Sequence, residues 1–441
     1  MRIAALLAGT IIASGTGTQA LAQSGPPPVR QSIDENGVDL MRRSFNTSAT
    51  DVSIGSGDQG MAFERVWRGW EWRNNFVATI NNTGGLFVVS IGGSSDSFSY
   101  ASYPTFVSTE GNGATLVLSG SDYVYTSPDG TVAVFAPHGN QYDTFGSNVG
   151  WIRHITFPGG DRWTYHYKAG QWCGFGSWNG SSCDTALNTS LRVQSVTNRF
   201  GYQIKLEYAA NSMTDWPSYT PWKTIAKATA INNGVEYCDP VADSCALSNP
   251  WPYVSYAKSG TTETVTDSVG TVRTYTYSSS GQAILGIRRA TAASDSVTVG
   301  YTSGKVSTLT NEGVTYNYSE WVNGNQRGVD VSGPGGYSRS VRSHATEYAL
   351  WGIYDPGNRY TGYIRDAKWR VNEIYHLDGD RTLYTLDARG NVTETRRVAK
   401  TGSGLADIVT TAGFDANCAN ALVCNKPLWT RDAKGNQTDY T

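Results

Sequence analysis

Short apolar runs rich in β-branched and aromatic residues alternate with clusters of Gly, Asn, Asp and Ser from about Val38 to Tyr167. Leu86-Phe87-Val88-Val89 and Thr131-Val132-Ala133-Val134-Phe135 are typical of these runs. Runs of this length that are bounded by turn-forming residues predict short β-strands joined by tight turns. The rhythm loosens between residues 168 and 260, where we expect loops or an insertion.

Tyrosines follow several glycines at fixed offsets. Gly160 is followed by Tyr165 and Tyr167, five and seven positions later, and tyrosines follow Gly270 at the same offsets. Residues two positions apart on a β-strand lie on the same face of the sheet. We therefore predict a repeated unit in which a glycine turn starts a strand whose two rings share one side.

The strongest internal repeat lies near the C-terminal end. Residues 387–394, Asp-Ala-Arg-Gly-Asn-Val-Thr-Glu, recur in type at residues 432–439, Asp-Ala-Lys-Gly-Asn-Gln-Thr-Asp. Asp387 and Asp432 favour a turn because an Asp side chain accepts a hydrogen bond from the backbone two residues on. Gly390 and Gly435 permit the positive φ that such a turn needs. The repeat predicts hairpins. Each of its residues has a role in the turn or the following strand, so the motif does not indicate a functional site.

The composition supports a β-rich protein and excludes several function classes. The 441 residues are too many for one compact domain. Only 16% of them are charged, whereas 49 are glycine and 12% are aromatic, which disfavours both a helical bundle and disorder. A formal net charge of -2 provides no global field to attract nucleic acid or anionic lipid. We predict a soluble protein that does not bind nucleic acid.

The N-terminal region predicts export. Residues 1–22 combine a positive start, an apolar stretch and the small residues of Ala20-Leu21-Ala22, which together are typical of a secretory signal. Residues 23–37 follow as a proline-rich linker. No later segment approaches the ~20 apolar residues that span a bilayer, so we predict no transmembrane anchor. We expect the mature chain to be secreted or to reside in the cell envelope, either in the periplasm or at the cell surface.

The six cysteines form three close pairs in the sequence, which are Cys173 with Cys183, Cys238 with Cys245, and Cys418 with Cys424. An oxidising compartment favours structural disulfides. Six cysteines allow 15 connectivities, of which pairing within each cluster is the simplest. Metal binding is the alternative, but none of the spacings is C-x-x-C and no histidine lies close to a pair. We therefore predict disulfides and no metal site.

The Asp-x-x-Gly-Asn-x-Thr unit and the strands Tyr275-Thr276-Tyr277 and Tyr316-Asn317-Tyr318 resemble the YD repeats of the RHS (rearrangement hotspot) family. The segment from Cys424 to Asn436 looks like repeats of secreted bacterial members. Ser127-Pro128-Asp129-Gly130-Thr131 is similar to the region that precedes the repeats in that family.

The resemblance implies an all-β fold in which antiparallel β-hairpin repeats form an open part of an RHS-type wound sheet or shell. It covers an RHS-associated β-region at 38–167 and YD-type repeats at 261–441. The loop-rich cysteine-containing segment at 168–260 lies between them and does not share the resemblance. In the family the shell encloses or displays a variable C-terminal segment that is often a toxin, and other members act in adhesion or competition at cell surfaces.

The end of the chain departs from the family pattern. The sequence stops at Thr441 inside a repeat unit, so we expect a partial member without a toxin of its own. Asp355-Pro356-Gly357 resembles the self-cleavage element of the family, but repeats follow it, which favours an ordinary turn. We also expect an unpaired apolar edge between Leu428 and Tyr440 that favours edge-to-edge association with another chain.

Catalytic signatures are missing from the sequence. It contains no H-E-x-x-H, no G-x-S-x-G and no G-x-x-x-x-G-K, and its five histidines are dispersed. Asp378 and Asp380 are the nearest approach to the two carboxylates of a glycosidase, but both lie in a predicted tight turn, where solvated acids are common. We predict no catalytic residue, no cofactor and no enzymatic activity.

Trp70 and Trp72 are candidates for contact with a glycan. Strand alternation places them on one face of the segment Trp67-Arg68-Gly69-Trp70-Glu71-Trp72-Arg73. Exposed rings of this kind stack on sugar faces, whereas buried rings fill a core.

Three functions follow from these observations. The first is an exported scaffold with a cell-surface interaction or toxin-encapsulation and delivery role, whose partner is a protein or a cell-surface glycan. The second is a carbohydrate-binding wall-associated protein, and the third is a secreted glycosidase.

Overall fold

The computed structural model describes residues 32–92, 94–102, 105–137, 148–173, 187–213, 216–346 and 348–440. Within these ranges the chain is almost entirely β-structure, which confirms the predicted all-β fold. One helix, α1 (Trp216–Lys223), and two 3-10 turns, η1 (Gly57–Gln59) and η2 (Pro334–Gly336), complete the regular elements of the described part. The predicted signal, 1–22, and linker residues 23–31 lie outside the described residues.

The first four strands form a separate antiparallel sheet, which we call the N-terminal sheet. In their order in the sheet they are β1 (Val38–Asp39), β2 (Ser44–Ile54), β3 (Met61–Arg68) and β4 (Trp72–Asn74). Met61, Phe63 and Trp67 are buried at alternate positions of β3. Alternation of this kind directs one face of the sheet into a core.

The next eight strands close into a barrel. They are β5 (Ala78–Thr83), β6 (Leu86–Ile91), β7 (Ser94–Ser102), β8 (Thr105–Ser108), β9 (Thr115–Ser119), β10 (Asp122–Thr126), β11 (Val132–Pro137) and β12 (Asn148–Thr156). Strand β12 closes the ring because residues 148–151 pair with β5, whereas residues 154–156 pair with the following strand. The barrel therefore branches into the rest of the sheet at β12.

The long sheet continues from β12 as a succession of antiparallel neighbours. Its strands are β13 (Arg162–Cys173), β14 (Leu187–Asn198), β15 (Tyr202–Tyr208), β16 (Ile225–Asn232), β17 (Tyr253–Ser259), β18 (Thr262–Asp267), β19 (Val272–Tyr277), β20 (Ile284–Arg288), β21 (Val297–Thr302), β22 (Lys305–Asn311), β23 (Val314–Asn323), β24 (Gln326–Ser332), β25 (Ser338–His344), β26 (Leu350–Asp355), β27 (Arg359–Arg365), β28 (Val371–His376), β29 (Arg381–Leu386), β30 (Val392–Val398), β31 (Ile408–Gly413), β32 (Trp429–Arg431) and β33 (Gln437–Asp439).

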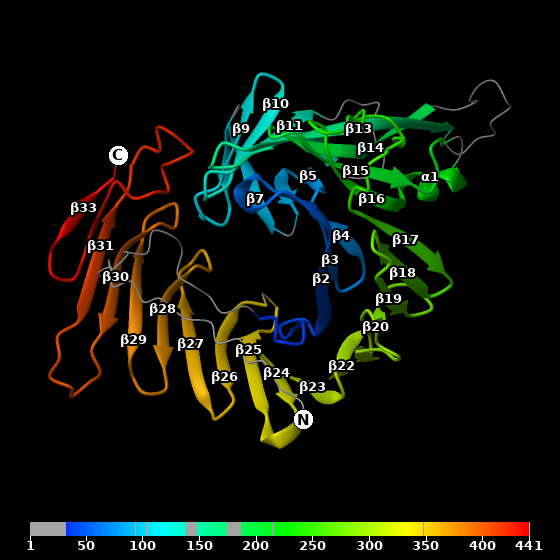
Figure 1. The fold of residues 1–441 in the computed structure, drawn as a ribbon. Helices are drawn as coiled ribbons and strands as arrows, with labels where there is room; N and C mark the ends of the chain where they lie inside the picture. Colours follow the sequence, from blue (N-terminus) through cyan, green and yellow to red (C-terminus); the bar gives the residue numbers. More distant parts are fainter. Residues whose placement is uncertain are drawn as a thin grey trace, which may run out of the picture.

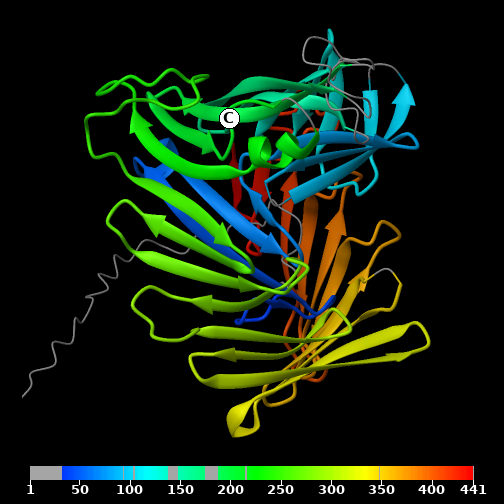
Figure 2. The same ribbon diagram turned by 90° about the vertical axis from the view of Figure 1, so that its right-hand side faces the viewer.

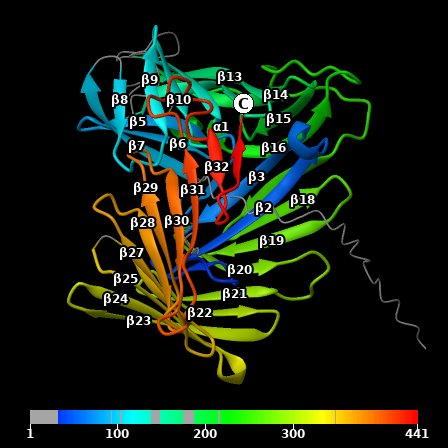
Figure 3. The same cartoon turned by 90° about the vertical axis from the view of Figure 1, so that its left-hand side faces the viewer.

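The long sheet curves around the N-terminal sheet. In Figure 1 it runs from the barrel through β17 and β22, turns at β23 and β24, and returns through β28 to β33, with β2 and β3 inside the curve. Figures 2 and 3 show the same arrangement from the two sides, with the blue N-terminal strands between the green and orange limbs. A single hydrophobic cluster joins Leu40 and Phe63 of the N-terminal region to Tyr275, Val306 and Ile353 of the long sheet.

The cysteine-containing segment, 168–260, holds more regular structure than its loosened sequence rhythm indicates. It includes the second half of β13, all of β14, β15, β16 and β17, and helix α1. Its longest described stretch without a strand or helix is 233–252. No helix of the described residues is long and apolar enough to cross a membrane.

Candidate interaction sites

A buried arginine anchors the N-terminal sheet to the long sheet. Arg65 of β3 forms ion pairs with Asp51 of β2 and, at 3.4 Å, with Glu263 of β18. Its guanidinium also lies 4.5 Å from the ring centroid of Trp72 and 4.3 Å from that of Tyr256. Burial alone would lower the pKa of Arg65, but Tyr256 and the two carboxylates outweigh it and raise that pKa.

A second ionic cluster lies where the long sheet turns, on β22, β23 and β24. Glu320 of β23 accepts hydrogen bonds from Lys305 at 2.7 Å and from Arg327 Nε at 2.5 Å, and it lies 3.1 Å from Arg43 of the N-terminal region. Arg327 also donates to the carbonyl of Met41. Burial opposes ionisation of Glu320, but the Lys305 and Arg327 contacts prevail and lower its pKa to about 2.

A pocket of about 810 Å³ remains between β2 and strands β17 to β22. Its lining mixes acidic and basic side chains, including Asp51, Asp267, Arg273 and Arg289. No group of three or more His, Cys, Asp or Glu residues in the described ranges could hold a metal ion.

The repeat residues Asp387, Gly390, Asp432 and Gly435 form two matching turns. Asp387 Oδ1 accepts the N–H groups of residues 389 and 391, both at 2.9 Å, and Asp432 Oδ1 accepts those of residues 434 and 436 at 2.9 and 2.8 Å. The φ values of Gly390 and Gly435 are 87° and 88°. Each residue of the motif thus shapes a hairpin turn.

Two of the predicted cysteine pairs are disulfides. Cys238 is bonded to Cys245, and Cys418 is bonded to Cys424; such bonds fit an extracellular protein. The remaining predicted pair is not described, because Cys183 and the side chain of Cys173 lie outside the described residues.

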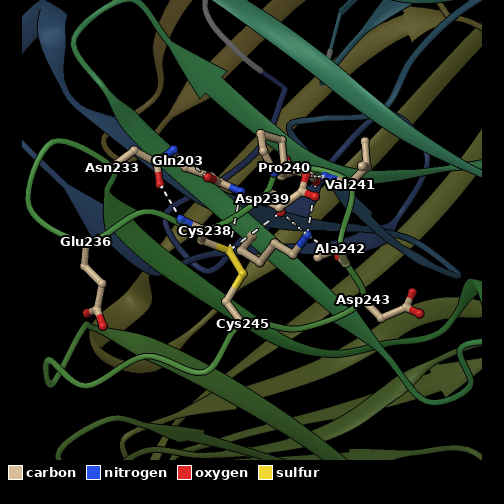
Figure 4. The surroundings of a disulfide bond; sticks show 12 residues. Gln203, Asn233, Glu236, Cys238, Asp239, Pro240, Val241, Ala242, Asp243 and Cys245 are labelled. Carbon is tan, nitrogen blue, oxygen red and sulfur yellow. Dashed lines mark hydrogen bonds between the residues drawn. A yellow bond between two sulfur atoms is a disulfide. The ribbon is translucent and has the colours of Figure 1, made fainter.

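The loop closed by Cys238 and Cys245 covers a buried lysine, which sequence reasoning did not single out. Lys205 of β15 donates to the carbonyls of Asp239 and Pro240, both at 3.1 Å, and to that of Ala242. Figure 4 shows these three loop residues beside the disulfide of Cys238 and Cys245. Burial lowers the pKa of Lys205 to about 8. The only sequence signal was a charged residue at an inward position of a strand.

The structure places Trp70 and Trp72 in different surroundings. Trp70 is 58% exposed and lies in the turn between β3 and β4. Trp72 donates from Nε1 to Tyr277 Oη at 2.8 Å and contacts the rings of Trp67 and Tyr275. The turn interrupts the strand alternation on which the shared face was predicted, so the two indoles do not form one sugar-stacking surface.

Asp378 and Asp380 lie in the turn between β28 and β29, where they line a pocket of about 610 Å³ with His376 and Tyr360. Asp380 Oδ2 is 4.0 Å from His376 Nε2. Thr361 Oγ1 lies 3.3 Å from His376 Nδ1. Asp380 and His376 are more than one-third exposed, so this group lacks the water exclusion that strengthens catalytic electrostatics.

This chain has limited similarity to known proteins, in sequence and in structure. No protein-family model and no curated protein matches the sequence. Solved structures of TcdB2-TccC3-Cdc42 and of TcdB2-TccC3 without its hypervariable C-terminal region match with TM-scores of 0.39, at 11% and 12% identity, over 80% of this chain and 20% of those chains. A porin-like protein from Bacteroides uniformis matches at 11% identity with a TM-score of 0.16, over 49% of this chain and 88% of that one. This chain spans about a fifth of the length of the TcdB2-TccC3 chains, and TM-scores at this level carry no argument about function.

Proposed function

We propose that this chain is an exported β-sheet scaffold that has no catalytic activity of its own and that serves interaction at the cell surface. The observation that carries the proposal is the single core shared by the N-terminal sheet and the surrounding long sheet. The Arg65 cluster adds an ionic contact from the N-terminal sheet to β18, and the Glu320 cluster adds one from Arg43, which lies between β1 and β2, to β23. A sheet supported from inside in this way holds its turns and outer face rigidly toward a partner.

Display of a partner on the outside fits the geometry better than enclosure of a toxin. The space left beside β2, about 810 Å³, falls within the ~300–1,000 Å³ of small-ligand pockets and is far too small for a folded domain. The N-terminal sheet already lies inside the curve of the long sheet (Figure 1), whereas contact through the turns requires no rearrangement. We therefore favour a surface-interaction role over toxin encapsulation.

Binding to whole cells tests this proposal. Fluorescently labelled protein is titrated onto bacterial cells and measured by flow cytometry, while mass spectrometry follows products released from the cells. We expect saturable binding that excess unlabelled protein displaces, with no released product. An Asp378→Asn/Asp380→Asn variant serves as the control for glycosidase activity. Release of sugar fragments by the wild type but not by this variant would contradict the proposal, and so would an absence of saturable binding.

A further inference from the structure

A tryptophan occupies the glycine position of a repeat turn. Asp366-Ala367-Lys368 is identical in type to the start of the repeat turn at 432–434, but Trp369 follows where Gly435 stands. The hydrogen bonds are also the same, because Asp366 Oδ1 accepts the N–H groups of residues 368 and 370 at 2.9 and 3.0 Å. Arg370 Nε donates to Asp366 Oδ2 at 2.8 Å, as the Asn436 amide does to Asp432.

The backbone at this position is strained. Trp369 has a φ of 63°, in the left-handed region that glycine adopts freely. Gly390 and Gly435 occupy the corresponding position in the two repeat turns that start at Asp387 and Asp432. A side chain in this region costs conformational free energy, and such strain concentrates at functional sites. Stability of the turn alone therefore does not account for an indole here, since glycine would form the same turn without strain.

The indole of Trp369 lines a pocket of about 400 Å³ at the end of strands β25, β26 and β27. Trp351 and His344 form other parts of its wall, and the His344 ring meets the Trp369 ring edge-on with centroids 5.3 Å apart. Arg365 fixes the wall by donating to the carbonyls of Leu350 at 3.0 Å and Trp369 at 2.6 Å. Trp369 itself remains 46% exposed, so its ring is available to a ligand.

The residues that line this pocket favour a neutral sugar as the ligand. Indole rings offer flat apolar faces with a polar N–H at the edge, and a pyranose ring offers the matching combination of a flat C–H face and hydroxyl groups. Arg365 is one of the residues that line the pocket, and its positive charge disfavours a cationic ligand. The Asp366 carboxylate is already occupied by the turn and by Arg370, so it does not attract a cation either. The volume of about 400 Å³ lies at the small end of ligand pockets and suits one or two sugar rings.

We propose that the pocket of Trp369, Trp351 and His344 binds a short neutral oligosaccharide, with the Trp369 indole stacked on a sugar ring. This site differs from the pair Trp70 and Trp72 that the sequence indicates. The inference goes beyond the scaffold role and does not depend on it, because sugar binding is measured on the purified chain without cells.

The repeat turns that contain Gly390 and Gly435 indicate which substitution of Trp369 tests the proposal. Trp369→Gly removes the indole while installing the residue that Gly390 and Gly435 carry, so the turn is expected to fold without strain. Trp70→Ala is the matched control, since Trp70 is an exposed tryptophan outside the pocket. Chitotriose, cellotriose and maltotriose are titrated into each protein by isothermal calorimetry, and choline is titrated as a cationic probe.

We expect the wild type to bind at least one trisaccharide. Trp369→Gly should weaken that binding about tenfold or more at an unchanged or raised melting temperature, and Trp70→Ala should not. If Trp369→Gly lowers the melting temperature, Trp369→Asn replaces it, because Asn tolerates positive φ. The proposal is overturned if the wild type binds none of the three sugars, if the folded Trp369 variant binds as well as the wild type, or if choline binds and the sugars do not.

Discussion

Aspartate side chains repeat one hydrogen-bond pattern at the turns of this chain. In each case Oδ1 accepts the backbone N–H groups two and four residues on, and the aspartates concerned are Asp34, Asp267, Asp366, Asp387 and Asp432. The hydrogen bond from the Thr271 backbone lowers the pKa of Asp267. Carboxylates held in this way accept backbone hydrogen bonds and shape the hairpin turns.

Substitution of two glycines of this motif distinguishes the cost of backbone strain from the cost of a steric clash. Gly390 and Gly435 have nearly equal φ values, but a Cβ on Gly390 would lie 2.7 Å from the carbonyl oxygen of Gly111, whereas a Cβ on Gly435 would meet nothing within 4 Å. We expect Gly435→Ala to lower the free energy of unfolding by about 1–2 kcal/mol. Gly390→Ala should lower it by at least about 1 kcal/mol more. Urea denaturation measures both, and equal losses would contradict the contact with the barrel loop.

Glu320 makes stability depend on acid pH. Its pKa falls from an ordinary 4.5 to about 2 in the folded chain, so its contribution is present above the unfolded value and is lost as the pH falls through the folded value. We expect the free energy of unfolding to decline between about pH 4.5 and about pH 2. Glu320→Gln should reduce this slope. An identical slope in the wild type and the variant would show that the Glu320 cluster does not stabilise the fold.

At the scale of elements, the local sequence pattern predicted the strands, but it did not predict the contacts between residues that are far apart in the sequence. The phased rings Tyr275 and Tyr277 are both buried on β19, as the glycine-based offset predicts. The split pairing of β12 and the ion pair from Arg65 to Glu263 join residues far apart in sequence, and no local pattern encodes them. Trp369 was missed because its turn lacks the glycine used as the origin of the repeat; alignment on Asp-Ala-Lys would have found it.

The loop closed by Cys238 and Cys245 gives a prediction at the same scale. Lys205 is 1% exposed beneath this loop, so we expect it to resist an amine-reactive reagent in the native chain. A Cys238→Ser/Cys245→Ser variant should loosen the loop and make Lys205 react, as measured by peptide mass spectrometry. Cys418→Ser/Cys424→Ser removes a comparable bridge elsewhere and should leave Lys205 protected. Protection of Lys205 in both variants would mean that hydrogen bonds alone hold the loop.

At the scale of the whole molecule, the long sheet has an edge strand, β33, at its C-terminal end. Strand β33 pairs with β32, and no pairing to its other side occurs among the described residues. Leu428 and Tyr440 near this edge are 51% and 44% exposed. The loop that follows β31 reaches the barrel, where the Asn425 amide donates to the carbonyl of Gly113 at 2.9 Å.

We propose that β33 associates with another chain, because among the described residues it is paired on one side alone and an exposed edge offers unpaired N–H and C=O groups to another strand. We expect static light scattering to show a molar mass that rises with protein concentration. Asp439→Pro removes an N–H that faces away from β32, because the hydrogen-bonded pairs of this hairpin are 428/440 and 432/436, and it should reduce the rise. Constant monomeric mass at high concentration would contradict edge-to-edge pairing.

We expect the N-terminal sheet to be a permanent part of the core. Hydrogen–deuterium exchange followed by mass spectrometry tests this most directly, because β3 is hydrogen-bonded on both sides, to β2 and β4, and its apolar face is buried. We predict that amides of Met61–Arg68 exchange as slowly as those of β18 and β19 in the surrounding sheet. Complete exchange of Met61–Arg68 within seconds, while β18 and β19 stay protected, would show that the N-terminal sheet leaves the interior and that the scaffold is hollow.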